Sequence, residues 1–183
     1  METRAYVAEG TKVSSVSEMR EKCSPTDCLA RMILGEAGNQ PQNEMIAVAY
    51  TANNRLQFPD KFGSDIKSVV LQGDGGQFNG IKSAVALNPT SHSAWSTCLN
   101  VAKTFTSKTN QIGHCLWFNT TSTYNANLKA NGGKYKFAGT TTALEVVSEV
   151  NLAMPIRFSL LKATIFNLHP LFKQLIFQKG AAD

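Results

Sequence analysis

The segment from Ser24 to Gly38 constrains the fold of this chain more than any other feature. Ser24 is suited to the N-cap of a helix, Pro25 fits the first helical position, and Asp27 falls where a capping-box acid would. The apolar residues that follow recur at the spacing of one helix face: Leu29, Met32 and Ile33. This pattern predicts a helix with one face in a hydrophobic core.

Glu36 falls on the same stripe, because it lies three and four residues beyond Ile33 and Met32. Gly35 and Gly38 indicate that the helix ends here, so the carboxylate lies near the negative end of the helix dipole. Partial burial and this dipole both favour the protonated form. A carboxylic acid that stays protonated near neutral pH is what a general acid for glycoside cleavage requires. The competing interpretation is a Glu that turns to solvent at a frayed helix end.

The residues after this glutamate resemble a signature of bacterial cell-wall hydrolases, the family that includes the spore-cortex-lytic (SleB-type) enzymes. The family's usual pattern is a Gly-Glu-Ala-Arg-Gly-Glu-Pro-like start, an Ala-Val-Ala helix and an Asn-Arg end. The corresponding runs here, at matching spacing, are Gly35-Glu36-Ala37-Gly38-Asn39-Gln40-Pro41, Ala47-Val48-Ala49 and Asn54-Arg55. Later segments match more loosely: Gln77-Phe78-Asn79, Gly113-His114 and Trp117-Phe118-Asn119. The resemblance covers approximately residues 26 to 145.

The resemblance implies a lysozyme-like fold and cleavage of the glycan strands of peptidoglycan, commonly as a lytic transglycosylase. It also implies that Glu36 is the catalytic acid. The chain departs from the pattern at Gly38, Asn39 and Gln40, where the family often has Arg, Gly and a second Glu. This departure bears on substrate preference more than on the class of reaction.

A hydrolytic glycosidase uses two carboxylates, so the acids after Glu36 matter. Each has an ordinary structural interpretation as a first-turn acid, a helix start or a turn residue: Glu44, Asp60, Asp65 and Asp74. A lytic transglycosylase needs no second acid, because the muramyl 6-hydroxyl replaces water. The alternative enzyme is a hydrolytic muramidase that uses water and Asp74. The alternative from another class is a catalytically silent wall or virion protein that binds glycan.

Sugar binding needs side-chain amides for hydroxyl and acetamido groups and aromatic rings for the apolar sugar faces. The second half of the chain supplies both kinds of group. The candidate substrate-binding residues are Gln77, Phe78, Asn79, His114, Trp117, Asn119 and Tyr124. Phe78 also has a core-packing interpretation. With three His and no metal-binding motif, we expect neither a zinc site nor a cofactor.

Composition and periodicity indicate an α+β fold that is mainly α, with extended segments near residues 115–118 and 135–137. The net charge of +5 favours attraction to an anionic cell wall. The Lys residues are scattered without a recognition motif, so we expect no nucleic-acid partner. Four Cys permit two disulfides in three connectivities, but free thiols are equally compatible: Cys23, Cys28, Cys98 and Cys115.

The sequence divides into an N-terminal segment (1–24), a catalytic domain (25–150) and an apolar, basic extension (151–183). Within the extension, Pro170 is expected to separate two helices. One interpretation is that these helices pack on the domain; the other is contact with a membrane or a virion protein. No signal peptide or membrane-spanning stretch is apparent. This organisation suits a bacteriophage lysin or a virion-associated enzyme that acts at the bacterial wall.

Overall fold

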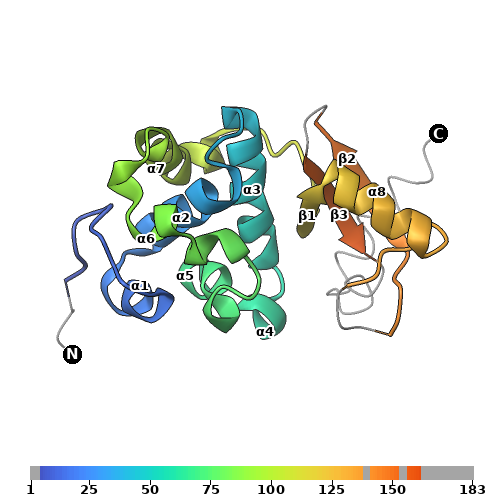
Figure 1. The fold of residues 1–183 in the computed structure, drawn as a ribbon, viewed down its shortest axis with the longest axis horizontal. Coiled ribbons are helices and arrows are strands. Elements are labelled where there is room, and N and C mark those ends of the chain that lie inside the picture. Colours follow the sequence, from blue (N-terminus) through green and yellow to red (C-terminus); the bar gives the residue numbers. More distant parts are fainter. Residues whose placement is uncertain (1–4, 138–140, 153–155, 162–183) are drawn as a thin grey trace. The chain divides into compact units, whose positions relative to one another are not determined.

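The computed structural model describes residues 5–137, 141–152 and 156–161. The chain divides into two compact units, Met1–Gly113 and His114–Asp183. Among the described residues, the first unit is helical and the second holds a small sheet with one helix (Figure 1). The fold is therefore α+β and mainly α, as the sequence predicts.

The first unit is built from short and medium helices joined by tight turns. Its α-helices are α1 (Val16–Lys22), α2 (Pro25–Ala37), α3 (Gln42–Arg55), α4 (Pro59–Phe62), α5 (Ile66–Val70), α6 (Ala84–Leu87) and α7 (Trp95–Thr104). Its 3₁₀ turns are η1 (Gln72–Asp74), η2 (Asn79–Lys82), η3 (Pro89–Ser91) and η4 (Phe105–Ser107).

Helix α2 is the centre of this unit and packs against α3, α5, α6, α7 and η2 (Figure 1). Its start follows the sequence prediction, because the Ser24 hydroxyl accepts a hydrogen bond of 3.1 Å from the amide of Asp27 and Pro25 occupies the first position. Leu29, Met32 and Ile33 are all buried. The predicted apolar stripe is therefore a core face.

The side chain of Asp27 differs from the prediction of a capping-box acid. Its Oδ1 accepts hydrogen bonds from the amide of Gly10 and from Nε of Arg31, both at 3.1 Å. Arg31 also donates to the carbonyls of Thr11 at 2.6 Å and Ala86 at 2.8 Å. Both charged side chains are fully buried. The pair ties the N-terminal segment and α6 to α2, so tertiary partners have replaced the local cap.

The second unit contains β1 (Trp117–Thr120), α8 (Thr121–Ala130), β2 (Val146–Asn151) and β3 (Ile156–Leu161). The sheet is antiparallel with the order β1-β3-β2, and Phe158 of β3 is opposite Phe118 on one side and Val150 on the other. Tyr124 of α8 stacks on Tyr135 with ring centroids 5.6 Å apart. The expected extended segment at 135–137 takes part in one isolated bridge, between Tyr135 and Leu144.

The prediction of a helix beginning in the extension is wrong for residues 156–161, which form the central strand of the sheet. Ile156 and Phe158 are buried at the strand's alternating spacing. Pairing on both edges has thus overridden the local helical pattern. Strand β2 also runs through the proposed domain boundary at residue 150. The remainder of the extension, with Pro170, lies outside the described residues.

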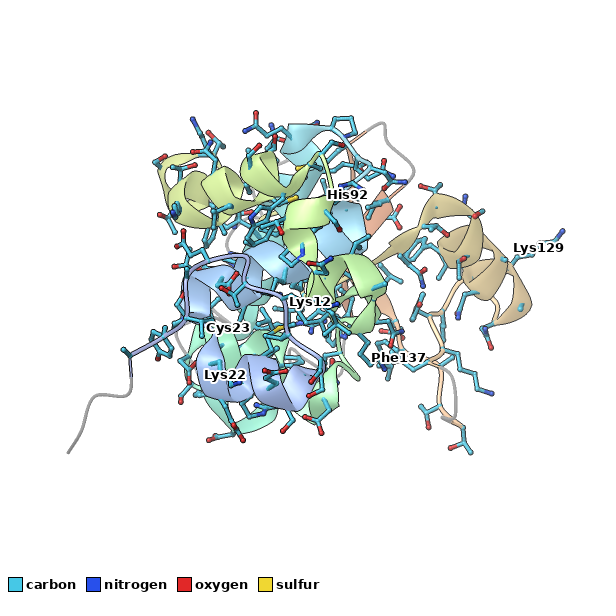
Figure 2. The ribbon with its side chains drawn as sticks, turned by 60° about the vertical axis from the view of Figure 1, so that its left-hand side comes forward. Lys12, Lys22, Cys23, His92, Lys129 and Phe137 are labelled. Atoms are coloured by element: carbon cyan, nitrogen blue, oxygen red, sulfur yellow. The ribbon has the colours of Figure 1, made fainter. Side chains whose placement is uncertain are left out.

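The four cysteines are buried free thiols. Cys23 follows the end of α1 (Figure 2) and Cys28 lies in the second turn of α2. A hydrogen bond with Cys23, together with burial, raises the pKa of the Cys28 thiol. In the described part of the chain, no helix has the length and apolarity needed to cross a membrane.

Candidate active site

Glu36 is the penultimate residue of α2 and is half-buried. Its Oε1 accepts a hydrogen bond of 2.6 Å from the backbone amide of Gly80, at the start of η2. The side chain therefore does not turn away to bulk solvent at a frayed helix end, which was the competing interpretation. A backbone donor from a distant segment fixes one of its two oxygen atoms.

Two glycines make this contact sterically feasible. A Cβ on Gly35 would overlap the backbone of Gly80, and a Cβ on Gly80 would overlap the backbone of Gly35. Any larger residue at either position would force α2 and η2 apart. The end of α2 and the start of η2 thus approach at backbone contact distance, and the Gly80 amide reaches the carboxylate.

Burial raises the pKa of Glu36 above its ordinary value. The hydrogen bond from Gly80 and the positive charge of Arg55 act in the opposite direction and favour the carboxylate. The predicted shift towards the protonated form is therefore present, and desolvation is its main cause. Burial disfavours the charged form, whereas Gly80 and Arg55 limit that penalty, and such a balance suits a group that first gives and then takes a proton.

Arg55, the last residue of α3, is 2% exposed. Its guanidinium lies between two rings, 4.9 Å from the centroid of Phe62 and 4.3 Å from that of Phe78. Its Nη1 is 3.5 Å from Oε1 of Gln77, a long hydrogen bond. Burial lowers the pKa of Arg55 to about 10, and the charge of Glu36 opposes this shift. Arg55 therefore remains a cation at neutral pH.

The predicted substrate-binding segment 77–79 is placed beside these groups, since Gly80 follows it directly. Gln77 and Asn79 are exposed, although Oε1 of Gln77 accepts the long hydrogen bond from Arg55. Phe78 is only 1% exposed, and its ring packs on Arg55. Its prediction as a sugar-stacking residue is corrected to a core residue, since a buried ring offers no face to a sugar.

The other predicted substrate-binding residues belong to the second unit. His114 is exposed and Trp117 is half-buried, with its ring 5.7 Å from that of Phe137. Asn119 donates a hydrogen bond of 2.8 Å from Nδ2 to the hydroxyl of Tyr135. Tyr124 is 1% exposed, and its hydroxyl donates to Glu149 at 2.8 Å. The ring of Tyr124 is thus a core element, in contrast to its predicted contact with substrate.

The additional acids have the structural roles that their sequence contexts indicate. Asp65 is the N-cap of α5, and Asp60 lies in the first turn of α4. Glu44 lies in the first turn of α3 and is fully buried. Asp74 is largely exposed and forms an ion pair of 3.0 Å with Arg20. Within the described ranges, no cluster of three or more His, Cys, Asp or Glu residues is arranged to hold a metal ion.

Sequence reasoning did not identify the roles of Gly80 and Arg55. Arg55 belongs to the Asn54-Arg55 motif only through the family resemblance, and none of the motifs above includes Gly80. The available signal was the position of Gly80 directly after Gln77-Phe78-Asn79, since a glycine beside a candidate site often allows close backbone approach. The residues around Arg55 at the end of α3 give no indication in the sequence that its charge acts on Glu36 of α2.

The model of a protein family described as Cell Wall Hydrolase matches residues 39–142. This match spans more than half of the chain and includes Arg55, Gln77 and Gly80. It begins just after Glu36, which therefore lies outside the matched range. Searches of curated proteins and of solved structures each returned no match.

Proposed function

The chain belongs to the cell wall hydrolase family, whose substrate is peptidoglycan, and we propose that it cleaves glycan strands between MurNAc and GlcNAc with Glu36 as general acid. The observation that carries this proposal is the half-buried carboxyl held by the Gly80 amide at 2.6 Å. Its raised pKa favours the protonated form that a general acid requires. Protonated Glu36 donates this proton to the glycosidic oxygen, and the bond to the leaving sugar breaks.

We propose that the reaction is that of a lytic transglycosylase. Once Glu36 has lost its proton, the carboxylate is stabilised by the Gly80 amide and by the charge of Arg55. It then takes the proton of the muramyl 6-hydroxyl, whose oxygen attacks the anomeric carbon and closes a 1,6-anhydro ring. One carboxyl group serves both steps, and its proton is restored at the end of the cycle.

The surroundings of the other acids support a mechanism with one carboxyl group. Asp65 is occupied in capping α5, and Asp74 pairs with Arg20 at an exposed position. Burial withholds Glu44 from direct contact with a substrate. A hydrolytic muramidase that relies on Asp74 is the alternative, and it would need this residue to leave its partner.

For substrate contacts we propose the exposed amides of Gln77 and Asn79 in the first unit. In the second unit we propose His114, Trp117 and Asn119, where the half-exposed indole offers an apolar face to a sugar. The net charge of +5 favours association with the anionic wall. A bacteriophage lysin remains our proposal for the biological setting.

Mass spectrometry of digested peptidoglycan tests the reaction. Anhydro-muramyl ends are expected from the wild-type protein, whereas reducing ends would identify a hydrolase and an absence of products would identify a binding protein. Glu36→Gln keeps the shape of the side chain but removes the proton, and should lower the rate at least ~100-fold. Asp74→Asn is the matched control and should retain activity. A Glu36→Gln protein with nearly wild-type activity would refute the assignment.

A further inference from the structure

We propose that Arg55 is the positioning residue of this site: it fixes the Gln77–Gly80 segment against α3, so that the Gly80 amide meets Glu36, and its charge stabilises the Glu36 carboxylate. This inference rests on the proposed role of Glu36. It concerns a residue that is buried and so acts on the reaction through its neighbours rather than by touching the substrate.

The first part of the inference follows from the packing of the segment that carries Gly80. Phe78, two residues before Gly80, lies with its ring 4.3 Å from the Arg55 guanidinium. The Gln77 amide oxygen is 3.5 Å from Nη1 of the same group. Phe62 of α4 covers the guanidinium from another side at 4.9 Å. The planar group thus joins α3 and α4 to the start of η2, which donates the hydrogen bond to Glu36.

The second part concerns charge. Glu36 and Arg55 act on each other electrostatically, and burial of Arg55 weakens the screening by water. The other charged groups on the elements around α2 have different surroundings. Lys67 of α5 donates to the carbonyl of Cys23, Lys103 of α7 pairs with Glu9, Lys82 of η2 is exposed, and Glu44 lies buried in the first turn of α3.

A guanidinium is suited to this place for reasons that do not extend to Lys. It is planar and stacks between aromatic rings, it stays charged when buried, and it presents several fixed donors. Lys would keep the charge but would lose the stacking and the geometry. The pair of variants Arg55→Lys and Arg55→Met therefore separates the contribution of charge from that of shape.

Carbon-13 NMR of the Glu36 carboxyl group, assigned by its loss in Glu36→Gln, measures the effect of charge without any assay of activity. In Arg55→Met the titration midpoint of Glu36 should move to higher pH, because the cation that favours the carboxylate is gone. In Arg55→Lys it should stay near the wild-type midpoint. Lys22→Met removes a partly exposed positive charge of α1 that pairs with Glu18 (Figure 2), and it should leave the midpoint unchanged.

Kinetics on peptidoglycan provide the matching test of positioning. Arg55→Met should lower the maximal rate by up to about 100-fold, the scale on which a misplaced catalytic group loses rate. The alkaline limb of the variant's pH–rate profile should move to higher pH together with the titration midpoint of Glu36. Arg55→Lys should return the alkaline limb to its wild-type position and recover part of the maximal rate. If Arg55 were purely structural, replacing it would lower the amount of folded protein, and the alkaline limb of the pH–rate profile measured on the folded fraction would stay in place.

The wild-type protein gives an independent measurement in case Arg55→Met does not fold. The Nε–H resonance of Arg55 should shift with pH at the same midpoint as the Glu36 carboxyl. In Glu36→Gln this titration of the Arg55 resonance should be absent. An Arg55 resonance that does not change across the titration of Glu36 would overturn the inference. The proposed function would then still stand if Glu36→Gln abolished cleavage, whereas an active Glu36→Gln would remove the proposed function itself.

Discussion

The amide of Gly80 donates a hydrogen bond of 2.6 Å to Oε1 of Glu36, although the two residues lie 44 positions apart in the sequence. The bond depends on the contact between the glycine backbones at positions 35 and 80. It converts a carboxyl group at a helix end into a group with a defined orientation.

Gly80→Ala should impair both the site and the fold. The new Cβ would lie 2.7 Å from the amide nitrogen of Glu36 and would overlap Gly35, so η2 must move and the hydrogen bond to Glu36 is lost. We expect a destabilisation of about 1–3 kcal/mol in urea unfolding and a rate lower by up to about 100-fold. Gly76→Ala is the control, since its nearest neighbour is the Gly73 carbonyl at 3.2 Å. Equal effects of the two changes would contradict the steric argument.

The pH dependence of stability should reveal the raised pKa of Glu36. Its ordinary value of 4.5 applies to the unfolded chain, and burial raises it in the folded protein. Between these two pKa values the folded state holds more protons, so the stability of the wild-type protein should fall there as pH rises. Glu36→Gln lacks this titration. As the pH rises above 4.5, we therefore expect the melting temperature of the variant, measured by calorimetry, to increase relative to that of the wild type. A constant difference would argue against the shift.

The buried pair of Asp27 and Arg31 should contribute strongly to folding. Arg31→Met leaves a buried carboxylate without its cation and three carbonyls without their donor. The expected loss is about 3–5 kcal/mol in the free energy of unfolding, measured in urea. Lys103→Met is the control, because the ion pair of Lys103 with Glu9 is partly exposed to water and its loss should be about 1 kcal/mol or less. Comparable losses in the two variants would refute the distinction.

Truncation should distinguish the central strand from the rest of the extension. Deletion from residue 151 onward removes β3, unpairs β1 and β2, and takes away the buried side chains of Ile156 and Phe158. We expect aggregation or a clearly lower melting temperature, because hydrophobic burial supplies most of the folding free energy. A chain that stops after residue 161 retains the sheet and should be the more stable of the two in calorimetry. A soluble, fully stable shorter chain would show that β3 is dispensable.

Local chemistry in the sequence was sufficient to predict α2. Ser24 and Pro25 define its start, the apolar stripe defines its buried face, and that face includes Glu36. These features act within one or two helical turns, so their spacing along the chain carries the information. The raised pKa of Glu36 follows from the same reasoning, since a carboxyl group on a core face loses hydration.

Only the tertiary structure decided which groups meet Glu36 and how the extension begins. The Gly35–Gly80 contact, the position of Arg55 between two rings and the burial of Phe78 all join segments far apart in the chain. The strand at residues 156–161 likewise depends on pairing with β1 and β2. Spacing within a segment does not encode such partners, because backbone hydrogen bonds, ring contacts and desolvation between segments arise only when the chain has folded.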